Sequence, residues 1–191
     1  ALAPSEQYDD YQKGGIYSGG AVVGDDGKLY LFYTGTLVKE GKVIKSQCVA
    51  FSEDGVNFEK FIGNPVVPPT DLVESDPKVW KYKDKWYMIV GGELDKKGRA
   101  ILYVSDNLTK WELFGTILES DGSLGAMWEC PDLFHVDGYD ILVIGPMHLN
   151  EQKCTYLVGN MDYENCRFEP EITGEVDFGF DYYAPQSFEA P

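Results

Sequence analysis

Two carboxylates stand beside prolines in the sequence and could act together. Asp76 directly precedes Pro77, and Glu129 lies two residues before Pro131. Two carboxylates in one polar pocket can protonate a leaving oxygen and attack or stabilise the positive carbon left behind, which is the chemistry of glycoside hydrolysis. Each also has an ordinary explanation, because Asp before Pro commonly caps a turn and Glu is commonly a solvated surface residue.

An internal repeat favours the functional interpretation. Prolines 77, 131 and 185 recur every 54 residues, and four strand-like segments can be traced in each unit, separated by Asp-Gly turn signals. Four short strands at a period of about 40–55 residues are typical of β-propeller blades. The recurring segments are 29–35, 86–92 and 141–145, then 47–52, 100–105 and 155–160, then the aromatic-Glu pairs at 58, 111 and 168.

We therefore predict an all-β fold with blades near 18–61, 76–114 and 130–169, and a strand within 184–191 that begins the next blade. A propeller needs at least four blades to close, so the chain is expected to be part of a longer propeller.

The first strand of each propeller blade lines the central axis. In register with the prolines, the starts of these strands carry Tyr17-Ser18, Ser75-Asp76, Glu129-Cys130 and Tyr183-Ala184. The repeat thus predicts that Asp76 and Glu129 face a common axis from adjacent blades. Trp128 fits either a sugar platform or a core ring, and Cys130 fits either a role beside Glu129 or simple space filling.

Composition excludes several partners. The net charge of −16 disfavours nucleic acid and anionic membranes, and no apolar run is long enough to span a bilayer. The four cysteines form no CxxC pair, and only His135 and His148 are present, so no metal or other cofactor is expected. His135 is expected to be a packed core residue. Unpaired thiols favour a cytoplasmic location.

The motifs resemble those of glycoside hydrolase family 32, which includes invertases, sucrose-6-phosphate hydrolases, levanases and inulinases. The strongest is WECPDL at 128–133, similar to the family's ECPDL signature. Four more follow the family's order. YSGGA at 17–21 resembles FSGSA, and QCV at 47–49 followed by GNPV at 63–66 resembles a family strand and connection. SDPKV at 75–79 resembles RDPKV, and DYYAPQ at 181–186 resembles DFYAxQ.

The resemblance implies a five-bladed propeller followed by a β-sandwich, and retaining hydrolysis of terminal β-fructofuranosyl linkages in a sugar or fructan. It makes Glu129 the general acid/base and Asp76 a transition-state stabiliser. The substrate-binding residues would be Tyr17, Ser18, Ser75, Cys130 and Tyr183.

The sequence departs from the family in two places. The WMNDPNG motif that carries the nucleophilic Asp does not occur, and Ser75 stands where the family has Arg. We therefore expect the first blade and the β-sandwich to lie outside the 191 residues, and the chain alone to be inactive. Two alternatives stay open: a sugar-binding propeller without catalysis, and a five-bladed glycosidase of the arabinan- and xylan-cleaving type.

Overall fold

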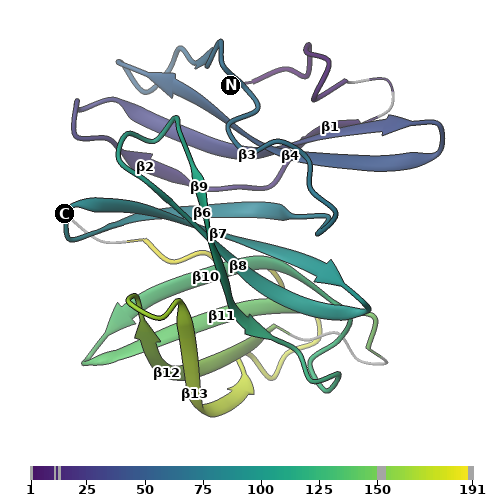
Figure 1. The fold of residues 1–191 in the computed structure, drawn as a ribbon, viewed down its shortest axis with the longest axis vertical. Helices are drawn as coiled ribbons and strands as arrows, with labels where there is room; N and C mark the ends of the chain where they lie inside the picture. The colour runs from purple at the N-terminus through teal and green to yellow at the C-terminus, as the bar shows by residue number, and fades with distance from the viewer. Residues whose placement is uncertain (1, 11, 13, 150–153, 189–191) are drawn as a thin grey trace. The chain divides into compact units, whose positions relative to one another are not determined.

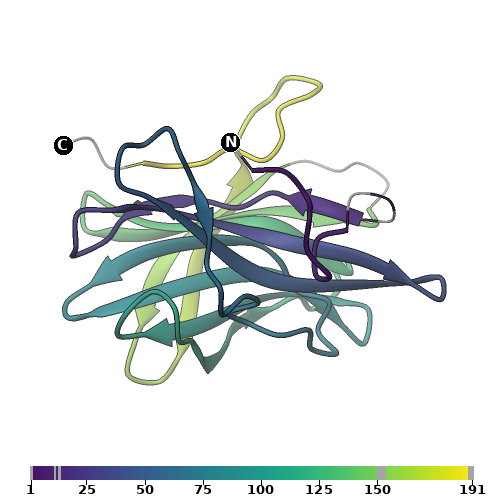
Figure 2. The ribbon, with the colours of Figure 1, turned by 90° about the horizontal axis from the view of Figure 1, so that it is seen from above.

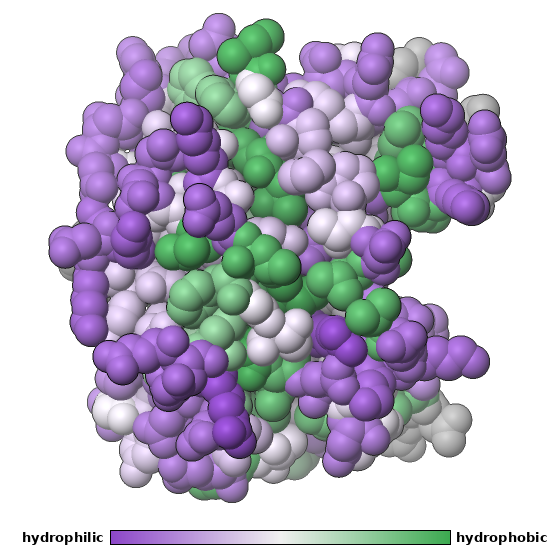
Figure 3. Space-filling model, viewed as in Figure 1, coloured by the Kyte–Doolittle hydropathy of each residue, from purple (hydrophilic) through white to green (hydrophobic). Residues whose placement is uncertain are grey.

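The computed structural model describes residues 2–10, 12, 14–149 and 154–188. Over these ranges the regular structure consists of β-strands in three sheets, with no α-helix (Figure 1). The all-β prediction is confirmed. Among the same residues no helix has the length and apolar character needed to cross a bilayer. Hydrophilic side chains cover much of the face drawn in Figure 3, as expected for a chain rich in Asp and Glu.

The first sheet is built on a long hairpin of two strands that lie side by side in both ribbon views (Figures 1 and 2). Its turn, Glu40-Gly41, has positive φ at both residues, as a type I′ turn requires. Two short strands pair with the same side of β3 and form one interrupted inner strand. The strands are β1 (Gly14–Tyr17), β2 (Ala21–Val23), β3 (Leu29–Lys39), β4 (Lys42–Ser52) and β5 (Glu59–Lys60).

The other two sheets each have four strands joined in sequence order. Their central strands are rich in β-branched and aromatic residues, which suit a pleated surface buried on both sides. The second sheet contains β6 (Ser75–Tyr82), β7 (Lys85–Leu94), β8 (Lys97–Ser105) and β9 (Glu112–Glu119). The third contains β10 (Met127–Val136), β11 (Tyr139–Met147), β12 (Thr155–Asp162) and β13 (Arg167–Glu175).

The sheets extend beyond the limits expected from the sequence. The first begins at Gly14 rather than residue 18, because Gly14 and Gly15 pair with β3 although they carry no apolar signal. The second continues to Glu119, and the third runs from Met127 to Glu175. The expected strand from Ala184 is absent over the described residues 184–188, since no strand pairs with that segment; residues 189–191 lie outside the description.

The chain forms two compact units, Ala1–Met88 with Tyr103–Leu113, and Ile89–Leu102 with Phe114–Pro191. In the first unit Tyr33, Cys48 and Ala50 form a buried cluster. In the second, Trp128 is fully buried, and its indole N–H donates to the Leu124 carbonyl oxygen at 2.6 Å. Trp128 is thus a core ring rather than an exposed platform.

Candidate functional site

Asp76 lies at the start of β6 in an unusual backbone conformation. Its φ of 60° is in the left-handed region that residues other than Gly rarely adopt. The residues before the other two repeat prolines share this feature, with φ of 46° at Cys130 and 53° at Ala184. The 54-residue repeat therefore reproduces a local backbone kink. Such outliers persist only where surrounding contacts hold them.

Thr34 on β3 connects the predicted residues of the first unit. Its hydroxyl oxygen accepts the backbone N–H of Asp76 at 2.8 Å, and its own N–H donates to the Ser18 carbonyl at 3.2 Å. Thr34 is also the register partner of Tyr17. The side chains of Tyr17 and Ser18 are exposed, whereas Asp76 is half-buried. Tyr17, Ser18 and Asp76 thus all have backbone contacts or strand pairing with one buried threonine.

Ser75 supports Asp76 directly. Its side chain is 1% exposed, and its hydroxyl donates to Asp76 Oδ2 at 3.2 Å. This geometry favours a supporting contact over direct recognition of a sugar. The substrate-binding role expected for Ser75 stays a prediction.

Gln47 on β4 is a buried polar residue to which the sequence analysis assigned no role in the site. Its Nε2 donates to the Glu74 carbonyl oxygen at 2.9 Å, and its Oε1 accepts the Thr34 hydroxyl at 3.0 Å. The repeat held a signal for it: the matching positions in the other two units are Ala100 and Thr155. A glutamine in the buried part of a strand needs buried hydrogen-bond partners.

Glu74 is a second buried group that sequence analysis missed. Its side chain is 3% exposed and accepts the Tyr103 hydroxyl, at 2.7 Å to Oε1 and 2.9 Å to Oε2. Burial raises the pKa of Glu74, and the hydrogen bonds from Tyr103 and Thr70 lower it in part. Burial, followed by the negative charge of Glu74, raises the pKa of Tyr103. This contact could not be predicted from spacing, because the two residues are far apart in the chain.

Glu129 lies on β10 in the second unit, at a bulge between Glu129 and Asp132. A bulge changes the direction of a side chain relative to the regular strand. Glu129 is half-buried, and its Oε2 accepts the Tyr183 hydroxyl at 2.8 Å. The structure therefore brings together two residues that the sequence analysis had placed in one pocket.

Gly145 makes room for this contact. It is the register partner of Glu129 on β11, and a Cβ added there would lie 2.7 Å from the Tyr183 hydroxyl oxygen and 3.0 Å from Cζ. These separations are too short for non-bonded atoms. The same hydroxyl lies 3.3 Å from Met147 Sδ. A side chain at position 145 would therefore require the Tyr183 ring to shift away from Glu129.

The segment that carries Tyr183 is held to β10 by Asp132. The Asp132 carboxylate, 1% exposed, accepts the backbone N–H of Ser187 and, at 2.9 Å, its hydroxyl. This contact holds Ser187 against β10, although residues 184–188 form no strand. Cys130 follows Glu129 in the bulge and is half-buried.

The structure offers little for a metal. Over the described residues, no group of three or more His, Cys, Asp or Glu side chains could hold an ion. The expectation that His135 is a core residue is wrong: its side chain is 64% exposed, and Nδ1 lies 2.9 Å from Asp140 Oδ1. His135 lies near the end of β10, where the strand reaches solvent.

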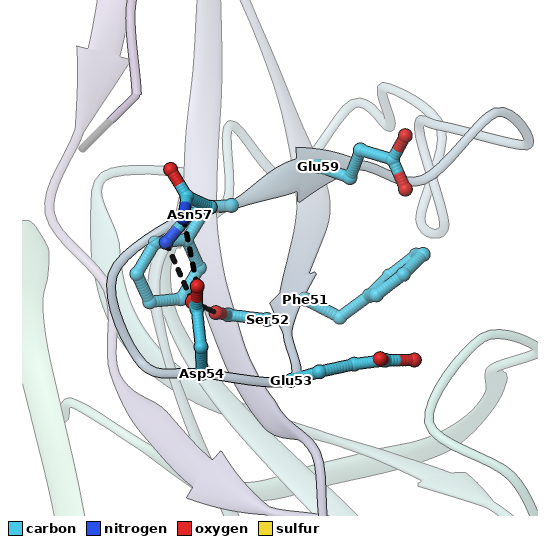
Figure 4. A pocket seen from close by; sticks show the side chains of 7 residues that line it. Phe51, Ser52, Glu53, Asp54, Asn57 and Glu59 are labelled. Atoms are coloured by element: carbon cyan, nitrogen blue, oxygen red, sulfur yellow. Dashed lines mark hydrogen bonds between the residues drawn. The ribbon is translucent and has the colours of Figure 1, made fainter.

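A surface hollow lies at the turn after β4 and contains none of the predicted site residues (Figure 4). Hydrogen bonds from the Asn57 and Val56 backbone N–H groups and from the Asn57 and Ser52 side chains hold the pKa of Asp54 well below its usual range. The Asp54 carboxylate is therefore engaged by its own turn, which gives it a structural role.

Comparison with known proteins identifies the family of the chain. The model of the "Glycosyl hydrolases family 32 N-terminal domain" matches residues 1–191. The chain belongs to glycosyl hydrolase family 32, and its fold is part of a β-propeller. The predicted family and fold class are confirmed.

Individual relatives are similar over almost the whole chain. Sucrose-6-phosphate hydrolase of Bacillus subtilis is 41% identical over 99% of the chain, and raffinose invertase of Escherichia coli is 34% identical over 98%. The β-fructofuranosidase of Bombyx mori, solved as a mutant in complex with sucrose, superposes with a TM-score of 0.85 at 40% identity over 92% of the chain. The chain spans 42%, 41% and 40% of these proteins.

Proposed function

We propose that the protein containing this chain hydrolyses terminal β-fructofuranosyl linkages with retention of configuration. The observation that carries this proposal is the contact between Glu129 and Tyr183 on a bulged inner strand. Family membership and the sucrose-bound relative support the substrate class.

Glu129 is the proposed general acid/base. The Tyr183 hydroxyl donates to Oε2, and Oε1 is the oxygen proposed to give its proton to the leaving group. The same carboxylate then removes a proton from the attacking water. Asp76, with its backbone held by Thr34, is proposed to bind fructosyl hydroxyls and stabilise the oxocarbenium-like transition state.

A retaining mechanism needs a carboxylate nucleophile about 5–5.5 Å from the acid, across the sugar. The family motif for that Asp does not occur in these 191 residues. We therefore propose that the nucleophile comes from outside them, and that the 191-residue chain alone releases no fructose at an enzymatic rate.

The test is fructose release from sucrose, sucrose 6-phosphate and inulin by the protein at its natural length. Glu129→Gln and Asp76→Asn should each lower kcat by at least about a hundredfold. Glu112→Gln, an exposed position on β9, is the matched control and should change nothing. The preferred fructoside identifies the substrate among the three.

Two outcomes would contradict the proposal. Cleavage of arabinan or xylan oligosaccharides but not fructosides would favour the other five-bladed glycosidase class. Sucrose binding by calorimetry without fructose release from any substrate would favour a binding propeller, for which the replacement of the family Arg by Ser75 is the supporting observation.

A further inference from the structure

The residues before Pro77 lie on an edge of the second sheet. β6 is the first strand in the order β6-β7-β8-β9, so one of its sides has no neighbouring strand in that sheet. In an extended segment the carbonyl of residue i and the N–H of residue i+2 point to the same side. The Glu74 carbonyl and the Asp76 N–H are such a pair.

Two side chains from the first sheet take the place of the absent strand. Gln47 Nε2 donates to the Glu74 carbonyl at 2.9 Å, and the Asp76 N–H donates to Thr34 Oγ1 at 2.8 Å. The Thr34 hydroxyl donates to Gln47 Oε1 at 3.0 Å, so the two side chains and residues 74–76 form a closed hydrogen-bonded network. The donor and acceptor of each of these three hydrogen bonds are defined. The threonine hydroxyl has only one proton to donate, and the Glu74 carbonyl oxygen can accept only from the amide nitrogen of Gln47.

This hydrogen-bonded network is buried and contacts a residue with a strained backbone. Thr34 is 0% exposed and Gln47 is 1% exposed, so water does not replace either bond. Asp76 has a positive φ and precedes proline, a combination that needs support from neighbouring groups. The hydrogen bond from Asp76 N–H to Thr34 fixes one end of the kinked segment, and the bond from Gln47 to Glu74 fixes the other.

We propose that Thr34 and Gln47 are positioning residues for Asp76. They hold the backbone of residues 74–76 so that the Asp76 carboxylate keeps the orientation needed for the transition state. This role rests on the proposed function of Asp76. Neither side chain is assigned a contact with substrate.

The chain offers a closely matched control. Thr36 lies two residues along β3, is 1% exposed, and its hydroxyl has no hydrogen-bond partner among the described residues. Thr34→Val and Thr36→Val are the same change in shape on the same strand. Only Thr34→Val removes the acceptor for Asp76 and the donor to Gln47.

The experiment measures kcat and KM for fructose release by the protein at its natural length. Thr34→Val should lower kcat about 10- to 100-fold, as expected for a misplaced reacting group, with KM changed less than about threefold. Thr36→Val should stay within about twofold of the parent in both constants. The amide of Asp76 should exchange with deuterium faster in Thr34→Val only.

If Thr34→Val does not fold, Thr34→Ala and Thr34→Ser provide a second pair of variants for the same test. Both lose the γ-methyl group, and only serine keeps the hydroxyl, so serine should retain most of kcat while alanine loses it. Equal kcat in the two variants, or in Thr34→Val and Thr36→Val, would overturn the inference.

Asp76→Asn separates this inference from the proposed function. An inactive Asp76→Asn beside a fully active Thr34→Val refutes the positioning role alone. A fully active Asp76→Asn refutes the function proposed for Asp76, and the role of Thr34 and Gln47 with it.

Discussion

Tyr103→Phe tests the buried carboxylate in the first unit. The substitution removes the Tyr103 hydroxyl, whose single proton is shared between Glu74 Oε1 and Oε2, at 2.7 and 2.9 Å. Two distances but one proton make this a single hydrogen bond to a charged group, which contributes about 1.5–3 kcal/mol. Glu74 is 3% exposed and Tyr103 is 4% exposed, so water cannot replace it. We expect the free energy of unfolding to fall by about 2 kcal/mol at pH 8, which lowers the urea midpoint by about 1 M.

The loss should depend on pH in a defined direction. Burial raises the pKa of Glu74 above its ordinary value of 4.5, so its contribution to stability is greatest below pH 4.5 and declines as pH rises through the folded pKa. Tyr103→Phe removes a contact that lowers this pKa, and so raises it further. The variant therefore favours the neutral form of Glu74 over a wider pH range than the parent does, and the destabilisation should be smaller at pH 5 than at pH 8.

The assay is urea unfolding followed by tryptophan fluorescence at pH 5 and pH 8. Taking the difference between variant and parent at each pH cancels the titration of the other carboxylates. Tyr139→Phe, at a position 51% exposed on β11, controls for the loss of a tyrosine hydroxyl. An equal loss at both pH values, or a loss no larger than that of Tyr139→Phe, would refute the reasoning.

Two further substitutions test other contacts. In the protein at its natural length, Gly145→Ala should displace the Tyr183 ring from Glu129 and lower kcat for sucrose roughly tenfold. The melting temperature should change little, because Tyr183 lies at the surface, with 41% of it exposed. A large drop in melting temperature would instead indicate a structural role for Gly145. Lys60→Met removes the partner at 2.6 Å from the fully buried Asp9 and should cost about 3–5 kcal/mol in chemical denaturation. Unchanged stability would contradict the importance of that ion pair.

The sequence could predict the sheets because each repeat contains its own strand pairings. Hairpins form between neighbouring segments, so short-range signals such as Asp137-Gly138 are sufficient: both residues have positive φ and join β10 to β11. Gly14 and Gly15 pair with β3 but have no apolar side chains, so the sequence predicted the first sheet to begin too late in the chain. The segment from Ala184 shares the motif and the kink of its repeats, but no described strand pairs with it.

The polar support of the candidate site could not be predicted in the same way. Thr34 and Gln47 contact residues 74–76 from the first sheet, and Tyr103 contacts Glu74 from β8. Such contacts depend on how the folded strands pack and not on the neighbouring sequence. A register shift of a single residue would turn each of these side chains to the opposite face. Spacing along the chain therefore identifies the carboxylates but not the groups that orient them.

The repeat explains why similar backbones carry different chemistry. Asp76, Cys130 and Ala184 occupy the same position before proline and share the same left-handed conformation. If this kink served catalysis alone, it would not be expected at an alanine, whose side chain has no polar atom. The kink is therefore better explained as a property of the repeated inner segment, in which a few positions have acquired functional side chains. Support specific to a carboxylate must then come from residues that differ between repeats. Thr34 meets that condition, because Gly91 and Ile144 occupy its position in the other two units.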